Sequence, residues 1–244
     1  PYRAVDFYVR GALGELSAIT VIALILLMMV WWIDHQNRKY VALTALAVAG
    51  LVLSHNLVAF MALPWLVLAF LVLIGVMKRS WVSVGYGMAT VLLGLLIGSF
   101  YALPAFFEKQ FTKVDVLTQG FSNYQQHFLY LRQFLQTEWG FGGSVFGLED
   151  DVSFQIGILH ILLAILGGMS VFLSKKKHRF GSMMLIVSGA MIVISMLMAT
   201  FKSQFIWDAI PLFEYVQFPW RYLSLIVVFA SIMAGASVRL LPDK

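Results

Sequence analysis

Seven long apolar runs dominate this sequence and restrict the folds that it can adopt. A helix needs about 20 apolar residues to cross a hydrocarbon core of about 30 Å, and most of the runs reach that length. Because every backbone amide must be paired inside lipid, continuous runs predict an all-α, polytopic transmembrane bundle of about seven spans. We treat residues 1–244 as a single integral-membrane domain. The runs cover approximately residues 16–33, 41–54, 57–77, 81–103, 154–173, 180–200 and 220–241.

The connections between the runs alternate in character. Short basic connections at 34–40, 78–80 and 174–179 alternate with non-basic ones, and all but two of the twelve carboxylates lie in the longer connections or in the N-terminal segment 1–15. Basic residues gather on the cytoplasmic side of multi-pass proteins, so we expect a cytoplasmic (inner) membrane location with the long connections outside. The two large outer connections are 104–153 and 201–219. Membrane lipids account for the net charge of +5 better than nucleic acid does, because the basic residues flank helix ends.

Local signals refine the ends of the spans. The stretch 41–77 is barely long enough for two crossings at about 1.5 Å per residue. Two crossings keep all the basic connections on one side, so we place a turn at Ser54-His55-Asn56. Pro104 is expected to end the fourth helix and to begin the first large outer connection.

Two segments outside the spans show helical spacing. Apolar residues repeat at helical intervals within residues 1–15, which predicts a helix at the membrane interface. Those within residues 124–137 predict a short helix on the surface. The chain starts at Pro1 without methionine and stops just after an apolar run, as expected of an internal fragment.

Three carboxylates near the ends of spans are candidate catalytic acids. Asp6 precedes Arg10 by four residues, so the two face one another on a helix, although an exposed ion pair explains them equally well. Glu15 immediately precedes a long apolar run, where a carboxylate needs a partner or a water-filled cavity. Glu108 follows Pro104 and either ends that helix or lies at a cavity mouth as a base or cation ligand.

Polar residues at the turns are candidate binding groups. His55 and Asn56 form either a polar turn at the interface or a site for phosphate binding and proton transfer, because histidine titrates near neutrality. Asp150 and Asp151 lie beside the glycine-rich turn that follows Trp139. They form either a solvated acidic turn or a site for a divalent cation, magnesium or manganese.

Glu214 and Arg221 lie just before the last run. Arg221 either extends its guanidinium to the lipid headgroups or binds phosphate through two hydrogen bonds. The phosphate-binding loop of nucleotide hydrolases and the short signatures of zinc proteases and serine hydrolases are absent from the sequence. Soluble nucleotide-driven chemistry is therefore not expected within these residues.

Six motifs lie on the outer side of the predicted topology. They are, in order, Tyr8-Val-Arg10-Gly-Ala-Leu-Gly-Glu15, Ser54-His55-Asn56, Tyr101-Ala-Leu-Pro104-Ala-Phe-Phe-Glu108, Trp139-Gly-Phe-Gly-Gly-Ser144, Ser153-Phe-Gln155-Ile-Gly157 and Phe218-Pro-Trp-Arg221. Together they resemble the bacterial membrane proteins of the 6-pyruvoyl-tetrahydropterin synthase-related domain family, which are similar to YfhO-like proteins and to the GT-C glycosyltransferases. The soluble pterin synthase is a zinc enzyme with a histidine cluster, whereas the five histidines of this chain are scattered.

The resemblance implies a transferase that takes a sugar from a polyprenyl-phosphate-linked donor outside the cytoplasmic membrane. In such enzymes the principal catalytic acid lies in the first outer loop, which here would precede or include residue 1. Inverting transfer needs a carboxylate base and positive charge for the leaving phosphate. The candidate acids are then Asp6, Glu15 and Glu108, and the candidate substrate contacts are Arg10, His55, Asn56, Trp139, Glu214 and Arg221.

Two other functions stay open at this point. A lipid or polysaccharide flippase or transporter would place ionisable residues at mid-membrane depth, whereas the centres of the runs are almost free of charge. A non-catalytic membrane assembly subunit would use the long outer connection to bind a partner.

Overall fold

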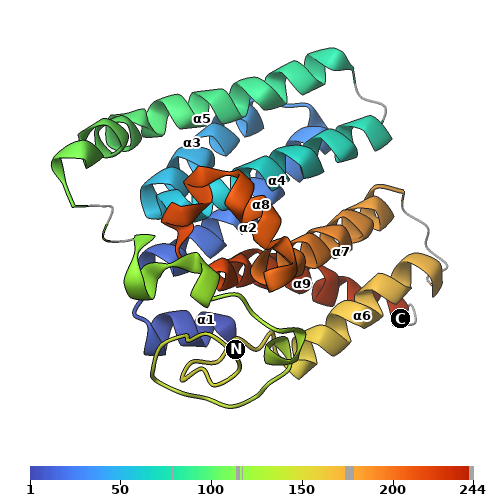
Figure 1. The fold of residues 1–244 in the computed structure, drawn as a ribbon. Helices are drawn as coiled ribbons and strands as arrows, with labels where there is room; N and C mark the ends of the chain where they lie inside the picture. The colour runs from blue at the N-terminus through green and yellow to red at the C-terminus, as the bar shows by residue number, and fades with distance from the viewer. Residues whose placement is uncertain (78–79, 114–115, 117, 174–178, 242–244) are drawn as a thin grey trace. The chain divides into compact units, whose positions relative to one another are not determined.

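The computed structural model describes residues 1–77, 80–113, 116, 118–173 and 179–241. Within these ranges the chain forms helices and short helical turns, with one isolated bridge between Leu129 and Thr200 (Figure 1). The all-α prediction is therefore confirmed. Two of the predicted basic connections, 78–80 and 174–179, lie almost wholly outside the described residues.

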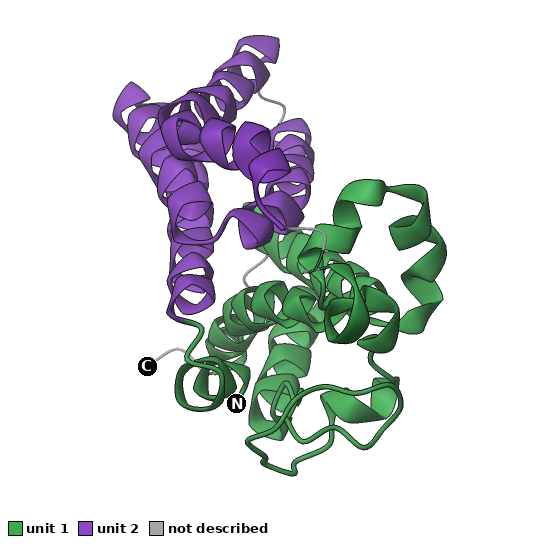
Figure 2. Cartoon of the chain, turned by 60° about the vertical axis from the view of Figure 1, so that its left-hand side comes forward, with its two compact units in different colours: residues 1–12, 114–244 green, residues 13–113 purple. Residues whose placement is uncertain are grey.

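The chain divides into two compact units, drawn in two colours in Figure 2. Unit 1 comprises residues 1–12 and 114–244, and unit 2 comprises residues 13–113. Unit 1 is thus built from both ends of the sequence. The single integral-membrane domain of the sequence analysis stays a prediction.

Unit 2 contains four long helices, which match the first four apolar runs. They are α2 (Leu13–His35), α3 (Arg38–Ser54), α4 (Asn56–Val76) and α5 (Trp81–Phe107). Helix α3 packs against both α2 and α5. The stretch 41–77 is divided between α3 and α4, so the predicted turn between two helices is confirmed.

His55 alone separates α3 from α4. Its backbone is extended, and its imidazole Nδ1 accepts a hydrogen bond of 3.2 Å from the backbone N–H of Val58. This side chain caps the first turn of α4, where helical N–H groups otherwise lack partners. The cap supports the interpretation of His55 as a polar turn residue, and its role toward phosphate stays a prediction.

Two prolines lie inside the helices of unit 2. Helix α4 continues through Pro64, and α5 continues past Pro104 to Phe107, where a 3-10 turn over Glu108–Phe111 follows. The predicted start of the outer connection at Pro104 is therefore too early, whereas Glu108 follows the last residue of α5, in agreement with one of the two roles predicted for it. Proline removes one backbone hydrogen bond, and near the end of a helix of 27 residues that loss is small beside the packing of the rest.

Small residues of α5 allow its backbone to lie close to α3. A Cβ added at Gly94 would lie 2.5 Å from Cβ of Val48 and 2.7 Å from the carbonyl oxygen of Ala45. Side-chain atoms essentially never approach that closely, so only glycine fits at position 94. Close backbone approach through small residues is a common way in which helices associate in membranes.

Unit 1 contains the helices that match the last three apolar runs. They are α6 (Ile158–Leu173), α7 (Arg179–Ala199) and α9 (Leu223–Gly235). Helix α9 packs against both α6 and α7. The last run is α-helical only in its middle, because 3-10 turns cover Pro219–Tyr222 and Ala236–Leu240.

The contact between α6 and α9 also depends on a glycine. A Cβ added at Gly167 of α6 would overlap the carbonyl group of Met233, at 2.7 Å from its carbon. The two backbones therefore touch directly, with no side chain between them.

The N-terminal segment of unit 1 is helical over a shorter range than the sequence predicts. Helix α1 (Tyr2–Ala4) runs into a π-helical turn at Val5–Val9, and the helical structure then stops. Gly11 has a φ of +62°, a left-handed conformation that ends the helix. The helix expected over residues 1–15 is therefore confirmed only as far as Val9.

The helix predicted over residues 124–137 is wrong. The structure has two short 3-10 turns, Tyr124–Gln126 and Leu131–Phe134, with an extended segment between them. In that segment the N–H of Leu129 donates to the carbonyl of Ala199. Tertiary contacts override the helical spacing, because the Phe128 ring packs against the ring of Trp207 on α8 (Gln204–Ala209), with 5.6 Å between centroids.

Among the described residues, five helical segments are long and apolar enough to cross a membrane. They are α2, α4, α7, the segment Trp81–Phe111 and the segment Pro219–Leu240. Helices α3 and α6 have 17 and 16 described residues. By helix length and composition the chain has the character of an integral-membrane protein, in agreement with the predicted fold class.

Candidate functional site

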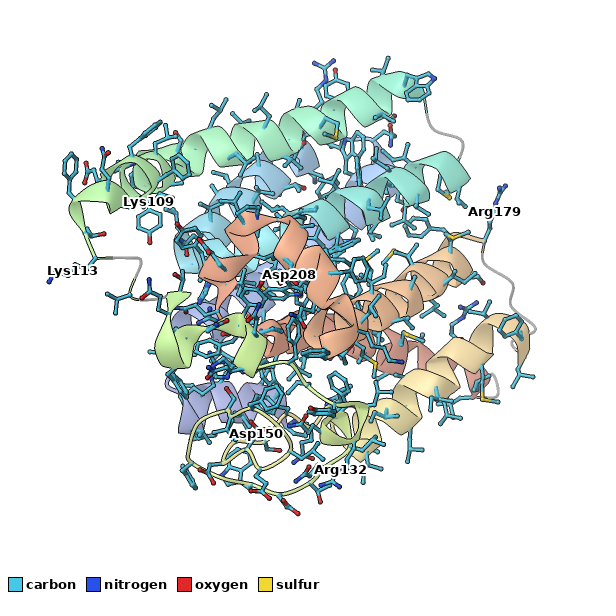
Figure 3. All side chains as sticks on the ribbon, viewed as in Figure 1. Lys109, Lys113, Arg132, Asp150, Arg179 and Asp208 are labelled. Carbon is cyan, nitrogen blue, oxygen red and sulfur yellow. The ribbon has the colours of Figure 1, made fainter. Side chains whose placement is uncertain are left out.

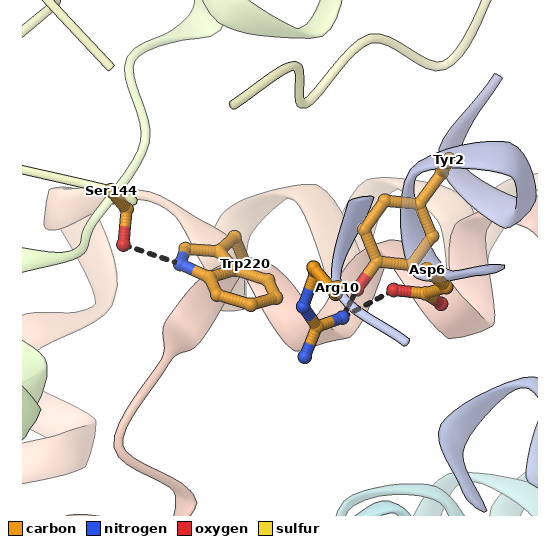
Figure 4. A network of polar contacts seen from close by, with 5 residues as sticks. All are labelled: Tyr2, Asp6, Arg10, Ser144 and Trp220. Atoms are coloured by element: carbon orange, nitrogen blue, oxygen red, sulfur yellow. Dashed lines mark hydrogen bonds and ion pairs between the residues drawn. The ribbon is translucent and has the colours of Figure 1, made fainter. Parts of the chain in front are cut away.

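A buried ion pair lies in the N-terminal segment of unit 1. The guanidinium of Arg10 donates to the carboxylate of Asp6, which is fully buried, and to the hydroxyl of Tyr2 at 3.3 Å (Figure 4). The same guanidinium lies over the ring of Trp220, 4.3 Å from its centroid. Because Asp6 has no exposed surface, the interpretation of this pair as an exposed one is wrong.

Trp220 continues this contact chain to the loop before α6. Its indole N–H donates to Oγ of Ser144 at 3.1 Å, and Oγ of Ser144 lies 2.7 Å from Nδ1 of His127. The other ring nitrogen of His127 bonds to the carbonyl of Phe121, so Nε2 carries the proton and Nδ1 accepts from Ser144. This arrangement requires a neutral imidazole, in agreement with burial, which lowers the pKa of His127.

We call Asp6, Arg10, Trp220, Ser144 and His127 the buried network. Asp6, Ser144 and His127 are at most 3 % exposed, so a substrate cannot reach them in this conformation. The network connects the N-terminal segment, the loop before α6 and the turn before α9, all in unit 1. Its contacts therefore hold these three segments together.

A polar pocket of about 220 Å³ lies in the loop that Ser144 anchors. Its described lining residues include three carboxylates and no lysine or arginine. Trp139, which is 45 % exposed, also lines it. The polar side chains are those of Gln133, Gln136, Glu138, Asp150, Asp151 and Ser153.

Asp150, labelled in Figure 3, accepts side-chain and backbone hydrogen bonds in the polar pocket. One oxygen accepts from the N–H of Val145 at 2.8 Å, and the other accepts from the amide of Gln133. Tyr130 fixes the amide of Gln133, because its N–H donates to Oε1 at 2.6 Å. Burial, helped by the charge of Asp151, raises the pKa of Asp150 to about 6 against the effect of these two donors.

The buried network and the polar pocket meet in one short stretch of chain. Ser144 of the network directly precedes Val145, whose N–H binds Asp150. The N–H of Gly142 donates to the carbonyl of Asp151 at 2.8 Å, and the N–H of Asp151 donates to the carbonyl of Gly143 at 3.1 Å. The network therefore holds the loop whose carboxylates line the pocket.

An apolar groove of about 470 Å³ lies beside the same loop in unit 1. Gln133 and Phe154 line the polar pocket, whereas Phe134 and Ile156 line the groove. The N–H of Ile156 donates to the carbonyl of Phe134 at 3.0 Å, so these two segments form a common wall. The rest of the groove is formed by α6, α7 and α9, through residues that include Ala164, Ile165, Gly189, Ile192, Ala230 and Met233.

The structure distributes the predicted site residues over both units. Glu15, His55, Asn56 and Glu108 belong to unit 2, where Glu15 is fully buried while Asn56 and Glu108 are exposed. Within unit 1, Asp6 meets Arg10, and Trp139 shares the polar pocket with both aspartates. The unit 1 residues are Asp6, Arg10, Trp139, Asp150, Asp151, Glu214 and Arg221.

Arg221 and Glu214 lie in the segment that precedes α9. The guanidinium of Arg221 donates to the carbonyl of Val216 and lies over the ring of Phe218, 5.0 Å from its centroid. Arg221 thus stabilises its own turn, and phosphate binding by it stays a prediction. Glu214 is half-buried. Burial and the neighbouring Asp208 raise the pKa of Tyr124 to about 12, and the charge of Glu214 adds a smaller contribution in the same direction.

The sequence analysis missed the uncharged members of the polar pocket. Gln133 lies in the 3-10 turn Leu131–Phe134, and Gln136 lies just beyond its end. Their spacing in the sequence did not show that both line one pocket, because that depends on how the following loop folds back. In the described part of the chain no group of three or more histidine, cysteine or acidic residues is placed to hold a metal ion. A metal at Asp150 and Asp151 stays a prediction.

Acidification is expected to weaken the buried network through His127. Burial lowers the pKa of folded His127 below its usual value of 6.5, so between these two values the unfolded chain binds more protons than the folded chain. The contribution of His127 to the free energy of unfolding therefore falls as the pH drops below about 6.5. Asp150 acts in the opposite sense, because its raised pKa makes the folded chain take up the proton first.

Two variants separate these opposed effects. His127→Gln removes the destabilising effect of acid, and Asp150→Asn removes the stabilising one. The measurement is the unfolding midpoint of each purified protein between about pH 7.5 and about pH 5. Identical pH dependence of the wild type and His127→Gln would contradict the role given to His127.

Comparisons of this chain with protein-family models, with curated proteins and with solved structures find no match.

Proposed function

We propose that this protein is an integral-membrane glycosyltransferase that takes a sugar from a polyprenyl-phosphate-linked donor on the extracytoplasmic face. The six motifs that resemble the 6-pyruvoyl-tetrahydropterin synthase-related family support this proposal, and so does the apolar character of the long helices. Four of these motifs supply residues to the buried network or the polar pocket of unit 1: Arg10, Trp139, Ser153 and Trp220 each belong to one of them.

One observation carries the proposal: the polar pocket and the apolar groove share a wall. A lipid-linked sugar has an apolar chain and a polar end, so its binding site needs both surfaces side by side. Gln133 and Phe154 line the polar pocket, and Phe134 and Ile156 of the same two segments line the apolar groove, so the two surfaces lie side by side. The volume of the groove, about 470 Å³, accommodates part of an isoprenoid chain.

The chemistry of transfer favours Asp150 over Asp6 as the base. A general base is most effective when its pKa is close to the working pH, and the pKa of Asp150 is raised to about 6. Asp6 is committed to Arg10 and has no exposed surface. In the proposed step the acceptor hydroxyl gives its proton to Asp150, its oxygen bonds to the sugar C1, and polyprenyl phosphate leaves.

A bulky residue in the groove is expected to block transfer. Gly189 lines the groove, and a Cβ there would only touch the Met233 side chain at 3.9 Å, so Gly189→Phe fills the groove without a backbone clash. Ala190 is exposed on the same helix and does not line the groove, so Ala190→Phe is the matched control. The assay is sugar transfer from a polyprenyl-phosphate donor by protein reconstituted in vesicles.

We expect Gly189→Phe to lower turnover at least about tenfold while Ala190→Phe stays near the wild type. Equal activity of the two variants would exclude the groove as the donor site. Movement of the donor across the vesicle membrane without bond cleavage would favour a flippase instead. Neither activity, together with a stable protein partner, would favour an assembly subunit.

A further inference from the structure

We infer that the polar pocket binds a neutral, polyhydroxylated unit of about the size of one monosaccharide, and that it excludes phosphate. This inference deepens the proposed function, on which it rests, because it assigns the pocket to a sugar and not to the charged part of a lipid-linked donor. It concerns Gln133, Gln136, Trp139, Asp150 and Ser153, of which the sequence analysis selected only Trp139 and Asp150.

The charges of the polar pocket exclude an anion. Glu138, Asp150 and Asp151 line it, and no lysine or arginine is found among its described lining residues. A phosphate in that position would meet like charges at short range without a compensating cation. An uncharged ligand avoids this repulsion, and its hydroxyl groups can donate hydrogen bonds to the carboxylates.

Two polar atoms of the pocket lack partners that hydroxyl groups would supply. Ser153 is 5 % exposed and lines the pocket, yet its Oγ has no hydrogen-bond partner among the described residues. The carbonyl oxygen of Gln136 is also buried without a partner there, although its amide donates to Glu138 at 2.7 Å. Buried polar groups are nearly always paired, so these two atoms indicate a missing polar ligand.

Asp150 is held in place to accept hydrogen bonds from a ligand. Its two oxygens are oriented by Val145 and Gln133, and each oxygen can accept a second hydrogen bond. No cation neutralises Asp150 within the described part of the chain, in contrast with Asp6. Hydrogen bonds to a carboxylate are about twice as strong as those between neutral groups.

The size and shape of the pocket fit a single sugar ring. Its volume of about 220 Å³ lies below the range of about 300–1,000 Å³ that is typical of sites for drug-sized ligands. The exposed Trp139 indole offers an aromatic face, whose negative potential attracts the polarised C–H groups of a sugar ring. An aromatic face beside carboxylates and amides is well suited to a ring that is apolar on its faces and polar at its edge.

The test measures binding directly, without a lipid donor. Saturation-transfer NMR on the purified full chain in nanodiscs uses uncharged hexoses as probes and inorganic phosphate as the anionic probe. The variants are Asp150→Asn, Trp139→Ala and Ser153→Ala. Their matched controls are Glu149→Gln and Phe146→Ala, because Glu149 and Phe146 are exposed neighbours that do not line the pocket.

We expect one or more hexoses to bind and phosphate not to compete with them. Asp150→Asn and Trp139→Ala should each weaken hexose binding at least about tenfold, and the controls should leave it within about twofold. Ser153→Ala should weaken binding without lowering the unfolding midpoint, because its hydroxyl has no partner in the protein to lose. This variant keeps the test valid if Asp150→Asn or Trp139→Ala fails to fold.

Two results would overturn the inference. One is phosphate binding to the wild-type pocket in competition with the hexoses, and the other is the absence of hexose binding or hexose binding that none of the three pocket variants weakens. Failure of this inference is distinguishable from failure of the proposed function. Hexose binding without any sugar transfer would leave the inference standing and remove the transferase, whereas transfer without hexose binding in the pocket would do the reverse.

Discussion

Gly94→Leu is expected to separate α5 from α3 and to lower the free energy of unfolding by about 3 kcal/mol. The first atom of the new side chain would already lie 2.5 Å from Cβ of Val48 and 2.7 Å from the carbonyl of Ala45. Neither contact can be relieved by rotation of a flexible side chain, because one involves the β-branched carbon and the other the backbone. The measurement is a detergent-denaturation titration followed by circular dichroism. Gly94→Leu should unfold at a lower midpoint than the wild type.

Gly85→Leu is the matched control for this prediction. Gly85 is exposed on the same helix, and a Cβ there meets no other atom within 4 Å. Leucine is a better helix former than glycine by somewhat less than about 1 kcal/mol, so this variant should be as stable as the wild type or slightly more so. If Gly94→Leu and Gly85→Leu unfold at the same midpoint, the close packing of α5 on α3 is refuted.

Arg10→Leu is expected to have a comparably large effect, a loss of about 3–5 kcal/mol in the free energy of unfolding. The variant leaves the fully buried carboxylate of Asp6 without the positive charge of Arg10, and it removes the cation that covers Trp220. Asp6→Asn should cost less, because the side chain of Arg10 is 18 % exposed and its charge can reach water. The two losses are compared by chemical denaturation of the purified variants.

A double variant and an exposed arginine complete this experiment. Asp6→Asn combined with Arg10→Leu removes both charges, so it should be more stable than Arg10→Leu alone. Arg3→Leu changes an exposed arginine of the same segment and should move the unfolding midpoint little. A double variant that loses the sum of the two single effects would show that the ion pair contributes nothing.

Helix positions could be predicted from the sequence because hydropathy alone determines them in a chain of this kind. Each of the seven apolar runs is matched by a helix in the described residues. The errors arose where local rules compete with the rest of the fold. At Pro104 a helix-ending residue is tolerated by a long helix, and near Phe128 contacts with Trp207 favour extended chain over helical spacing.

The candidate site could be predicted only in part. The spacing of Asp6 and Arg10 correctly indicated that they face one another, since four residues bring side chains onto one face. No local pattern joins this pair to Trp220, Ser144 and His127, which meet it only through the fold of unit 1. Gln133 and Ser153 were missed for the same reason, because their importance depends on which cavity they line.

The glycine contact between α6 and α9 determines how the apolar groove can change shape. Since the backbones touch at Gly167 and Met233, no flexible side chain separates these two helices at that point, and we expect them to move together. Helix α6 packs much less extensively against α7 than against α9. Under the proposed function, we therefore expect a lipid-linked donor to enter the groove between α6 and α7. The side chains of Ile192 and Met196 line the groove on α7 and can rotate. Entry of a ligand there would require changes of their rotamers and would leave the contact between α6 and α9 unchanged.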